Sequence, residues 1–189
     1  MREDEGGWEF PDTLVVWHPD GAPADPEGLP QFDELVIYCP DRSLPNRLVE
    51  MTLPGDARTV PPPEDTAQWE AEIEAIKRGS RWRAVMLTDL LRTGRVGNGA
   101  LGSRRGAAQF AVRLRPSQEE WQQFANGEIG WDELAWVQGI YGSQTGLRQV
   151  WVRIELQLVP GDRAAADTSG ATIPVPALGS AALYYQLER

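Results

Sequence analysis

Proline and glycine divide this chain into short segments, and that division limits what it can fold into. The 189 residues include 15 prolines and 19 glycines. Proline lacks a backbone donor and is disfavoured inside helices and central strands, so each regular element must fit between these residues. The 18–31 segment alone holds Pro19, Pro23, Pro26 and Pro30, which predicts an irregular connection. We therefore expect short strands and helices joined by long loops.

Alternating or β-branched apolar segments between these residues predict strands. The segments are 13–17, 34–39, 47–53, 107–115, 149–159 and 181–188. The first three follow one another at hairpin-like spacing, which favours an antiparallel meander. From Val150 to Leu158 an apolar residue stands at every second position, so we expect one face of that strand to lie in a core. The last three segments are expected to share one antiparallel sheet.

Helix signals occur in two regions. In 65–78, apolar residues recur at helical spacing. Asp65 or Thr66 can cap the start of this helix, and Gly79 follows its last turn. In 117–138, a capping box opens a short helix, and a further helical turn or two is expected over 131–138.

The 80–93 segment fits both helical spacing and strand alternation. We favour a helix, because Leu90 and Leu91 extend the apolar run beyond the length of a typical strand. The next segment, 94–106, holds five glycines and is expected to be an irregular loop.

Runs of strands and runs of helices that are separated in sequence predict an α+β fold. We expect a largely antiparallel sheet with two or three short helices packed on one face and long Pro/Gly-rich loops. Residues 1–189 are expected to form a single domain. Its less regular parts would be a loose acidic N-terminus at 1–11, the 94–106 loop and a Pro/Ala/Gly-rich connection at 160–177.

Composition excludes some classes of protein. No run of eighteen apolar residues is present, so we expect no membrane span. The acidic N-terminal residues lack the apolar stretch of a signal peptide. A single cysteine, Cys39, cannot form an internal disulfide, which suits a reducing compartment. These observations predict a cytoplasmic protein.

Sequence motifs give little support for catalysis. Residues 97–102 match the GxGxxG pattern, but neither a helix start nor a suitably placed acid follows, so a flexible loop is the better interpretation. His18 and Cys39 leave a nucleophile–base pair formally open, although Cys39 lies in an apolar strand typical of buried thiols. With one histidine and one cysteine a zinc site is not expected. We predict no catalytic residues, metal or cofactor.

A basic segment stands out in an otherwise acidic chain. Residues 77–115 hold ten basic side chains and one acid, Asp89, whereas the whole chain has a net charge of −10. One interpretation is that these side chains pair with the surplus acids of the chain. The other is that arginines beside a glycine-rich loop bind phosphates, with a tryptophan available for base stacking. The candidate residues for phosphate binding are Arg81, Trp82, Arg83, Arg92, Arg95, Arg104 and Arg105.

Three further residues are candidates for contact with a partner protein. Trp151 and Arg153 fall on the outward register of the 149–159 strand, and Trp136 lies off the apolar stripe of its predicted helix. Either a helix covers the outward face of this strand, or Trp151 is exposed and marks a contact surface.

The resulting hypothesis is a non-enzymatic accessory subunit of a nucleoprotein assembly, such as an RNA-containing effector complex. It would belong to a hetero-oligomer and touch nucleic acid locally, because its overall acidity opposes general binding to a duplex. The alternative is an acidic binding protein of the immunity or inhibitor type that neutralises a basic partner. A third possibility is a component of a virion or another assembly.

Overall fold

The computed structural model describes residues 2–4, 7–9, 11–25, 28–96, 103–136, 146–159 and 175–186, with the backbone alone for 2–4, 7–9, 95–96, 103–104 and 185–186. The chain divides into two compact units, Met1–Gln109 with Leu156–Ala177 and Phe110–Glu155 with Leu178–Arg189. The expectation of a single domain stays a prediction.

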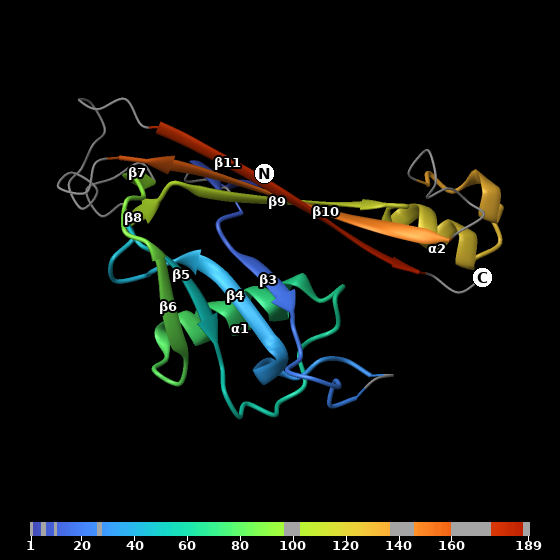
Figure 1. Cartoon of the computed structure of the whole chain (residues 1–189), viewed down its shortest axis with the longest axis horizontal. Helices are drawn as coiled ribbons and strands as arrows, with labels where there is room; N and C mark the ends of the chain where they lie inside the picture. Colours follow the sequence, from blue (N-terminus) through green and yellow to red (C-terminus); the bar gives the residue numbers. More distant parts are fainter. Residues whose placement is uncertain are drawn as a thin grey trace. The chain divides into compact units, whose positions relative to one another are not determined.

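The first unit contains a four-stranded antiparallel sheet (Figure 1). Its strands are β3 (Leu14–Trp17), β4 (Leu35–Pro40), β5 (Leu48–Thr52) and β6 (Arg83–Thr88), and they lie side by side in this order. The meander predicted from the first three strands is confirmed. Because the spatial order follows the sequence, β3 and β6 are the two edges of the sheet.

Helix α1 (Thr66–Arg78) follows β5 in the chain and covers one face of this sheet. The side chain of Asp65 accepts a hydrogen bond at 3.0 Å from a backbone N–H of the first turn, and Gly79 is the C-cap. Both features were predicted. Its buried residues, Ile73 and Ile76, point into the core.

The core beneath α1 is built from alternate residues of β4 and β5, since successive side chains of a strand point to opposite faces. The short 3-10 helix η1 (Phe32–Glu34) closes one end of it. The buried members are Phe32, Leu35, Ile37, Cys39, Val49, Met51, Leu53, Val60, Ile73 and Ile76. The sequence predicted a single sheet with both helices on one face, and we expected the 65–78 helix to pack on the strands at 107–115, 149–159 and 181–188. The buried residues of α1 instead pack against β4 and β5, which precede it in the chain.

A second sheet contains the three later strands in the order β11-β10-β9. These are β9 (Ala108–Arg115), β10 (Leu147–Leu158) and β11 (Val175–Gln186), and their arrows alternate in direction (Figure 1). The prediction that these strands share a sheet is confirmed. The last strand begins earlier than predicted, within the 160–177 connection, of which 160–174 lies outside the described residues.

The prediction that one face of β10 lies in a core is wrong. Every described side chain from Gln149 to Leu158 is half-buried or exposed, and none is buried. Alternation places the apolar side chains on one face, but burial also requires another element to cover that face.

Helix α2 (Gln118–Ala125) belongs to the second unit and starts at the predicted capping box. The Ser117 hydroxyl accepts from the Glu120 N–H at 3.2 Å, and the Glu120 carboxylate accepts from the Ser117 N–H at 2.8 Å. The helix predicted over 131–138 is wrong within the described residues. Only a 3-10 turn, η2 (Trp131–Glu133), forms, because Leu134 is already extended; residues 137 and 138 are outside the description.

The helix predicted over 80–93 is also wrong. Residues 83–88 form β6, which pairs with β5 from Thr52 opposite Arg83 to Leu48 opposite Thr88. The backbone partners offered by β5 outweigh a weak local preference for helix. Leu91 then forms an isolated bridge with Leu158 and is fully buried.

The 94–106 segment is more regular than the predicted loop. Strands β7 (Thr93–Val96) and β8 (Ser103–Gly106) pair as an antiparallel hairpin, and 97–102 lies outside the described residues. Glycine does not prevent this pairing. At Gly106 it is required, because a Cβ atom there would collide with the Pro45 carbonyl oxygen. The N-terminal lead-in likewise contains a small hairpin of β1 (Arg2–Asp4) and β2 (Gly7–Glu9).

Candidate functional site

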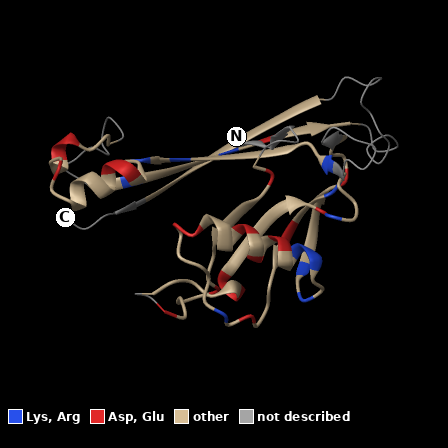
Figure 2. Ribbon diagram, turned by 180° about the vertical axis from the view of Figure 1, so that it is seen from behind, with Lys and Arg blue, Asp and Glu red and all other residues tan. Residues whose placement is uncertain are grey.

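The ten basic residues of the 77–115 segment do not gather on one element. They lie on the end of α1, on β6, on the β7–β8 hairpin, on β9 and in the connections between these elements (Figure 2). The hairpin brings some of the predicted phosphate ligands together, because Arg95 stands directly opposite Arg104 and Arg105 stands opposite Gly94. The basic segment of the sequence is therefore distributed over several elements, and phosphate binding by its residues stays a prediction.

Three of the predicted phosphate-binding residues have partners within the first unit. Arg92 Nη1 donates to Gln157 Oε1 at 3.1 Å, and Arg105 Nη1 lies 3.9 Å from Asp12 Oδ2. The indole N–H of Trp82 donates to the Gly79 carbonyl at 2.9 Å, and its ring packs against the core. Only the contact of Arg105 is with an acid, as the internal-pairing interpretation requires, because Arg92 bonds an amide and Trp82 a backbone carbonyl. Arg81 and Arg83 are exposed instead.

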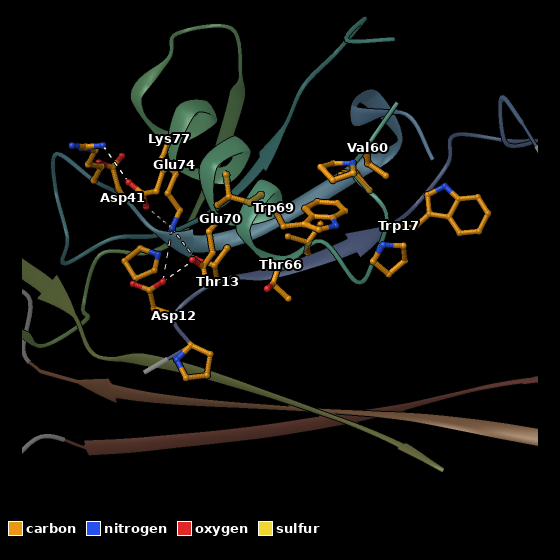
Figure 3. Close-up of a pocket in the computed structure, with 18 of the residues that line it drawn as sticks. Asp12, Thr13, Trp17, Asp41, Val60, Thr66, Trp69, Glu70, Glu74 and Lys77 are labelled. Atoms are coloured by element: carbon orange, nitrogen blue, oxygen red, sulfur yellow. Dashed lines mark hydrogen bonds and ion pairs between the residues drawn. The ribbon is translucent and has the colours of Figure 1, made fainter. Parts of the chain in front are cut away.

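The first unit contains a groove between one side of α1 and the edge strand β3 (Figure 3). It encloses about 1180 Å³. The helix contributes residues at successive turns of one side, which is why they form a single wall. These residues are Thr66, Trp69, Glu70, Ile73, Glu74 and Lys77.

At one end of the groove, Lys77 of the α1 wall contacts residues of the opposite wall. Its ammonium group donates to Thr13 Oγ1 at 2.7 Å and lies 3.8 Å from Asp12 Oδ1 and 4.0 Å from Glu74 Oε1 (Figure 3). Only 13% of this side chain is exposed. Arg42 adds a further ion pair to Glu74 at 3.6 Å. This end of the groove is therefore a network of mutually compensating charges.

The other end of the groove is aromatic and apolar. Trp69 packs edge-on against Phe32 with ring centroids 6.3 Å apart, and its indole N–H donates to the Pro62 carbonyl at 3.1 Å. Trp17 stands on the opposite wall and is 48% exposed (Figure 3). The groove therefore combines aromatic surface at one end with a network of compensated charges at the other.

The candidate catalytic residues suggested by composition are not brought together. Cys39 is fully buried and its Sγ lies 3.6 Å from Met51 Sδ. Burial raises the pKa of the Cys39 thiol to about 11, so little thiolate is present at neutral pH. His18 is exposed on the segment after β3. Within the described ranges, no group of three histidine, cysteine or carboxylate side chains is placed to hold a metal ion.

The predicted partner-binding residues lie in the second unit, and two of them are half-buried. The ring of Trp136 packs at a tilt against that of Trp131, with centroids 4.8 Å apart, and its indole N–H donates to the Trp131 carbonyl at 2.8 Å, so Trp136 belongs to an aromatic cluster. The Arg113 guanidinium lies 5.9 Å from the centre of the half-buried Trp151 ring. Arg153 is exposed and lies 3.9 Å from Glu155.

Two exposed edge strands were missed by sequence reasoning. On β6, Val85, Met86 and Leu87 are 59%, 52% and 48% exposed. On β11, the large apolar side chains that are exposed are Val175, Leu178, Leu183 and Tyr184. The absence of charge from 175 to 186 was a usable signal for the second strand. For β6 no such signal was recognised, because the 80–93 segment was predicted to be a helix.

No protein-family model, curated protein or solved structure matches this chain. In the part of the chain that the structure describes, neither helix is long and apolar enough to cross a membrane.

Proposed function

We propose that this protein is a non-enzymatic subunit of a larger assembly and that it attaches to a neighbouring polypeptide through β11. The supporting observation is the exposure of that strand. From Val175 to Tyr184 every side chain except Ala177 is exposed, and β11 is an edge of its sheet. Leu178 and Leu183 are 70% and 60% exposed.

An edge strand of this kind is normally protected. Natural proteins shorten such edges or place charges on them, because unpaired backbone groups beside apolar side chains recruit other strands. β11 has twelve residues and no charged side chain. A neighbouring strand would satisfy its outer backbone groups and cover its apolar side chains in one step.

The phosphate-binding part of the sequence hypothesis has a narrower basis. Arg92 and Arg105 have partners in their own unit, which leaves Arg81 and Arg83 as exposed candidates with described side chains. A contact with nucleic acid through described side chains would therefore depend on these two arginines. The attachment of the subunit does not depend on it.

The proposal is tested in the native host with a photo-crosslinking residue in place of Leu183. A matched chain carries the same residue in place of Gln122, which is exposed on α2 of the same unit. We expect a discrete crosslinked polypeptide from the β11 position alone. The double substitution Leu178→Lys and Leu183→Lys should reduce the native particle to the free chain, since charges on an edge oppose strand pairing. Gln122→Lys should leave the particle unchanged.

A native particle of the mass of one chain, unaffected by the β11 substitutions and without a specific crosslink, would contradict the proposal. A retained basic protein that crosslinks at acidic positions rather than at β11 would favour the immunity-type alternative. Loss of particle mass on nuclease treatment would add a nucleic acid to the assembly.

A further inference from the structure

The outer edge of β6 is a second surface that lacks a described partner. β6 is the last strand in the order β3-β4-β5-β6, and within the described ranges no strand pairs with its other side. Val85, Met86 and Leu87 are all about half exposed or more, at 59%, 52% and 48%. This surface lies in the first unit and belongs to a different sheet from β11, the strand of the proposed function.

The exposed residues occupy both faces of the sheet. Val85 stands opposite Glu50, and Met86 stands opposite Val49, a core residue beneath α1. Met86 is therefore on the helix-covered face and Val85 on the other face, because successive side chains alternate. A partner resting on one face would leave the other residue bare. An extended strand beside β6 would cover both.

The start of this edge is basic. Arg81 and Arg83 precede Val85 and are exposed, and within the described residues neither has a carboxylate within ion-pair distance. The side-chain hydrogen bonds from Arg58 to Asp56, at 2.9 and 2.8 Å, are the main cause of the lowered pKa of Asp56, and the charge of Arg81 contributes least. Two cations beside an apolar edge are complementary to a carboxylate-bearing ligand.

The geometry points to β6 as the acceptor of an extended segment of another protein, apolar at its centre and carrying Asp or Glu where it passes Arg81 and Arg83. Main-chain hydrogen bonds supply affinity in this mode and side chains supply selectivity. The irregular pairing between Leu48 and Val49 places an extra residue, Leu87, on β6. This bulge and the short length of β6, six residues, disfavour pairing with an arbitrary strand. The charges of Arg81 and Arg83 then select the partner.

A single-stranded nucleic acid is the weaker candidate for this edge. Its phosphates would satisfy Arg81 and Arg83, but its backbone offers no strand partner to β6 and would leave Val85 and Met86 exposed. The net charge of −10 also opposes a polyanion more than a short peptide with one or two carboxylates.

The test uses the intact chain and three fluorescent probes. Two peptides share the centre Val-Ile-Val-Ile and differ only in a flanking Asp-Glu or Lys-Lys pair, and the third probe is a single-stranded RNA of eight nucleotides. Binding is measured by anisotropy for the wild type, for Arg81→Glu with Arg83→Glu, and for Arg113→Glu with Arg115→Glu. The last variant reverses two exposed arginines at the same spacing on β9.

We expect the acidic peptide to bind the wild type and to lose about tenfold in affinity with the β6 variant, because two charge matches become two repulsions. The Lys-flanked peptide should gain affinity for that variant, a change that a misfolded protein cannot produce. The β9 variant should bind as the wild type does. Bound peptide should also slow hydrogen exchange in residues 83–88 and leave α2 unchanged.

Three results would overturn the inference: equal loss in the β6 and β9 variants, peptide binding without protection of 83–88, or RNA binding that depends on Arg81 and Arg83 while neither peptide binds. Loss of the native particle in the β11 variants with intact peptide binding would separate this edge from the proposed function.

Discussion

The two principal sheets use similar sequence patterns and reach very different degrees of burial. In β4 and β5, Ile37, Cys39, Val49 and Met51 are at most 4% exposed, because α1 covers their face of the sheet. In β10, no described residue from 149 to 158 is buried, although apolar and polar residues alternate there more regularly. Alternation decides which side chains share a face. A covering element decides whether that face becomes a core.

The sheets also differ in how their surroundings are fixed. Arg58 joins the loop after β5 to α1, with hydrogen bonds to Asp56 at 2.9 and 2.8 Å and to Glu72 at 3.1 Å. Its guanidinium also lies 4.8 Å from the centre of the Phe32 ring. β11 carries no charged residue. The α1-covered face of the first sheet therefore completes its contacts within the chain, whereas β11 of the second sheet presents an uncharged, exposed edge.

The largest expected difference between the sheets is in thiol reactivity. Cys39 reacts with a thiol reagent only as thiolate, and a pKa of about 11 lowers the thiolate fraction at pH 7. The reduction is about 300-fold relative to an ordinary thiol of pKa ~8.5. A chain with Cys39→Ala and Ser180→Cys places the thiol on exposed β11 and should react at an ordinary rate. Reaction with a chromogenic disulfide measures both rates. Equal rates in the native state would contradict the contrast, and equal rates in denaturant provide the control.

Core truncation should separate the sheets by free energy of unfolding. Ile37 is fully buried, so Ile37→Ala should lower that free energy by roughly 2–5 kcal/mol, from lost burial and the cavity left behind. Leu183 is 60% exposed, and Leu183→Ala should change it by less than about 0.5 kcal/mol. Urea denaturation at low protein concentration, followed by circular dichroism, measures both. Similar losses would mean that β11 is covered within the single chain.

Much of α1 could be predicted, because its signals are local. The cap at Asp65, the end at Gly79 and the apolar spacing of Ile73 and Ile76 all lie within the segment itself. The capping box at the start of α2 was predictable for the same reason. The class of fold, α+β with mostly antiparallel strands, follows from such elements and is confirmed.

The elements that were wrongly predicted depend on distant partners. β6 forms because it pairs with β5, a strand that precedes it in the sequence by the whole length of α1. No residue pattern within 80–93 indicates that this partner is available. The hairpin of β7 and β8 includes Gly94 and Gly106, which local rules assign to loops.

The candidate surfaces were less predictable still. Arg81 and Arg83 were identified from charge alone, but their use beside Val85 depends on β6 being an edge strand. The groove depends on a contact between Lys77 of α1 and Thr13, the residue just before β3 in the chain. These two residues are 64 positions apart in the sequence. Strand order and helix placement, which create edges and grooves, cannot be read from alternation.

A smaller effect is expected from the charge clusters that fix the first unit. Arg58→Ala removes hydrogen bonds to two carboxylates and a cation–π contact, but its side chain is 57% exposed and solvent screens the charges. We expect a loss of about 1 kcal/mol in the free energy of unfolding. Arg153→Ala on β10 breaks one 3.9 Å pair and should cost less than about 0.5 kcal/mol. Equal effects in urea denaturation would remove this distinction between the sheets.

The smallest predicted effect concerns the pH dependence of the first unit. Hydrogen bonds from the backbone N–H groups of Gln31 at 2.8 Å and Ala24 at 2.7 Å lower the pKa of Glu34 below its ordinary value of 4.5. A carboxyl whose pKa is lowered by folding stabilises the native state above the unfolded pKa and loses that contribution as the pH falls through the folded pKa. The wild type should therefore exceed Glu34→Gln in stability most at pH 6 to 7, and the gap should narrow below pH 4.5. Urea midpoints from pH 7 to 3 measure the gap, with the exposed Glu128→Gln as control. Because the amide retains one acceptor oxygen and the packing of the side chain, part of the gap is independent of pH. A gap of constant size across this range would show that the charge of Glu34 does not stabilise the turn beneath α1.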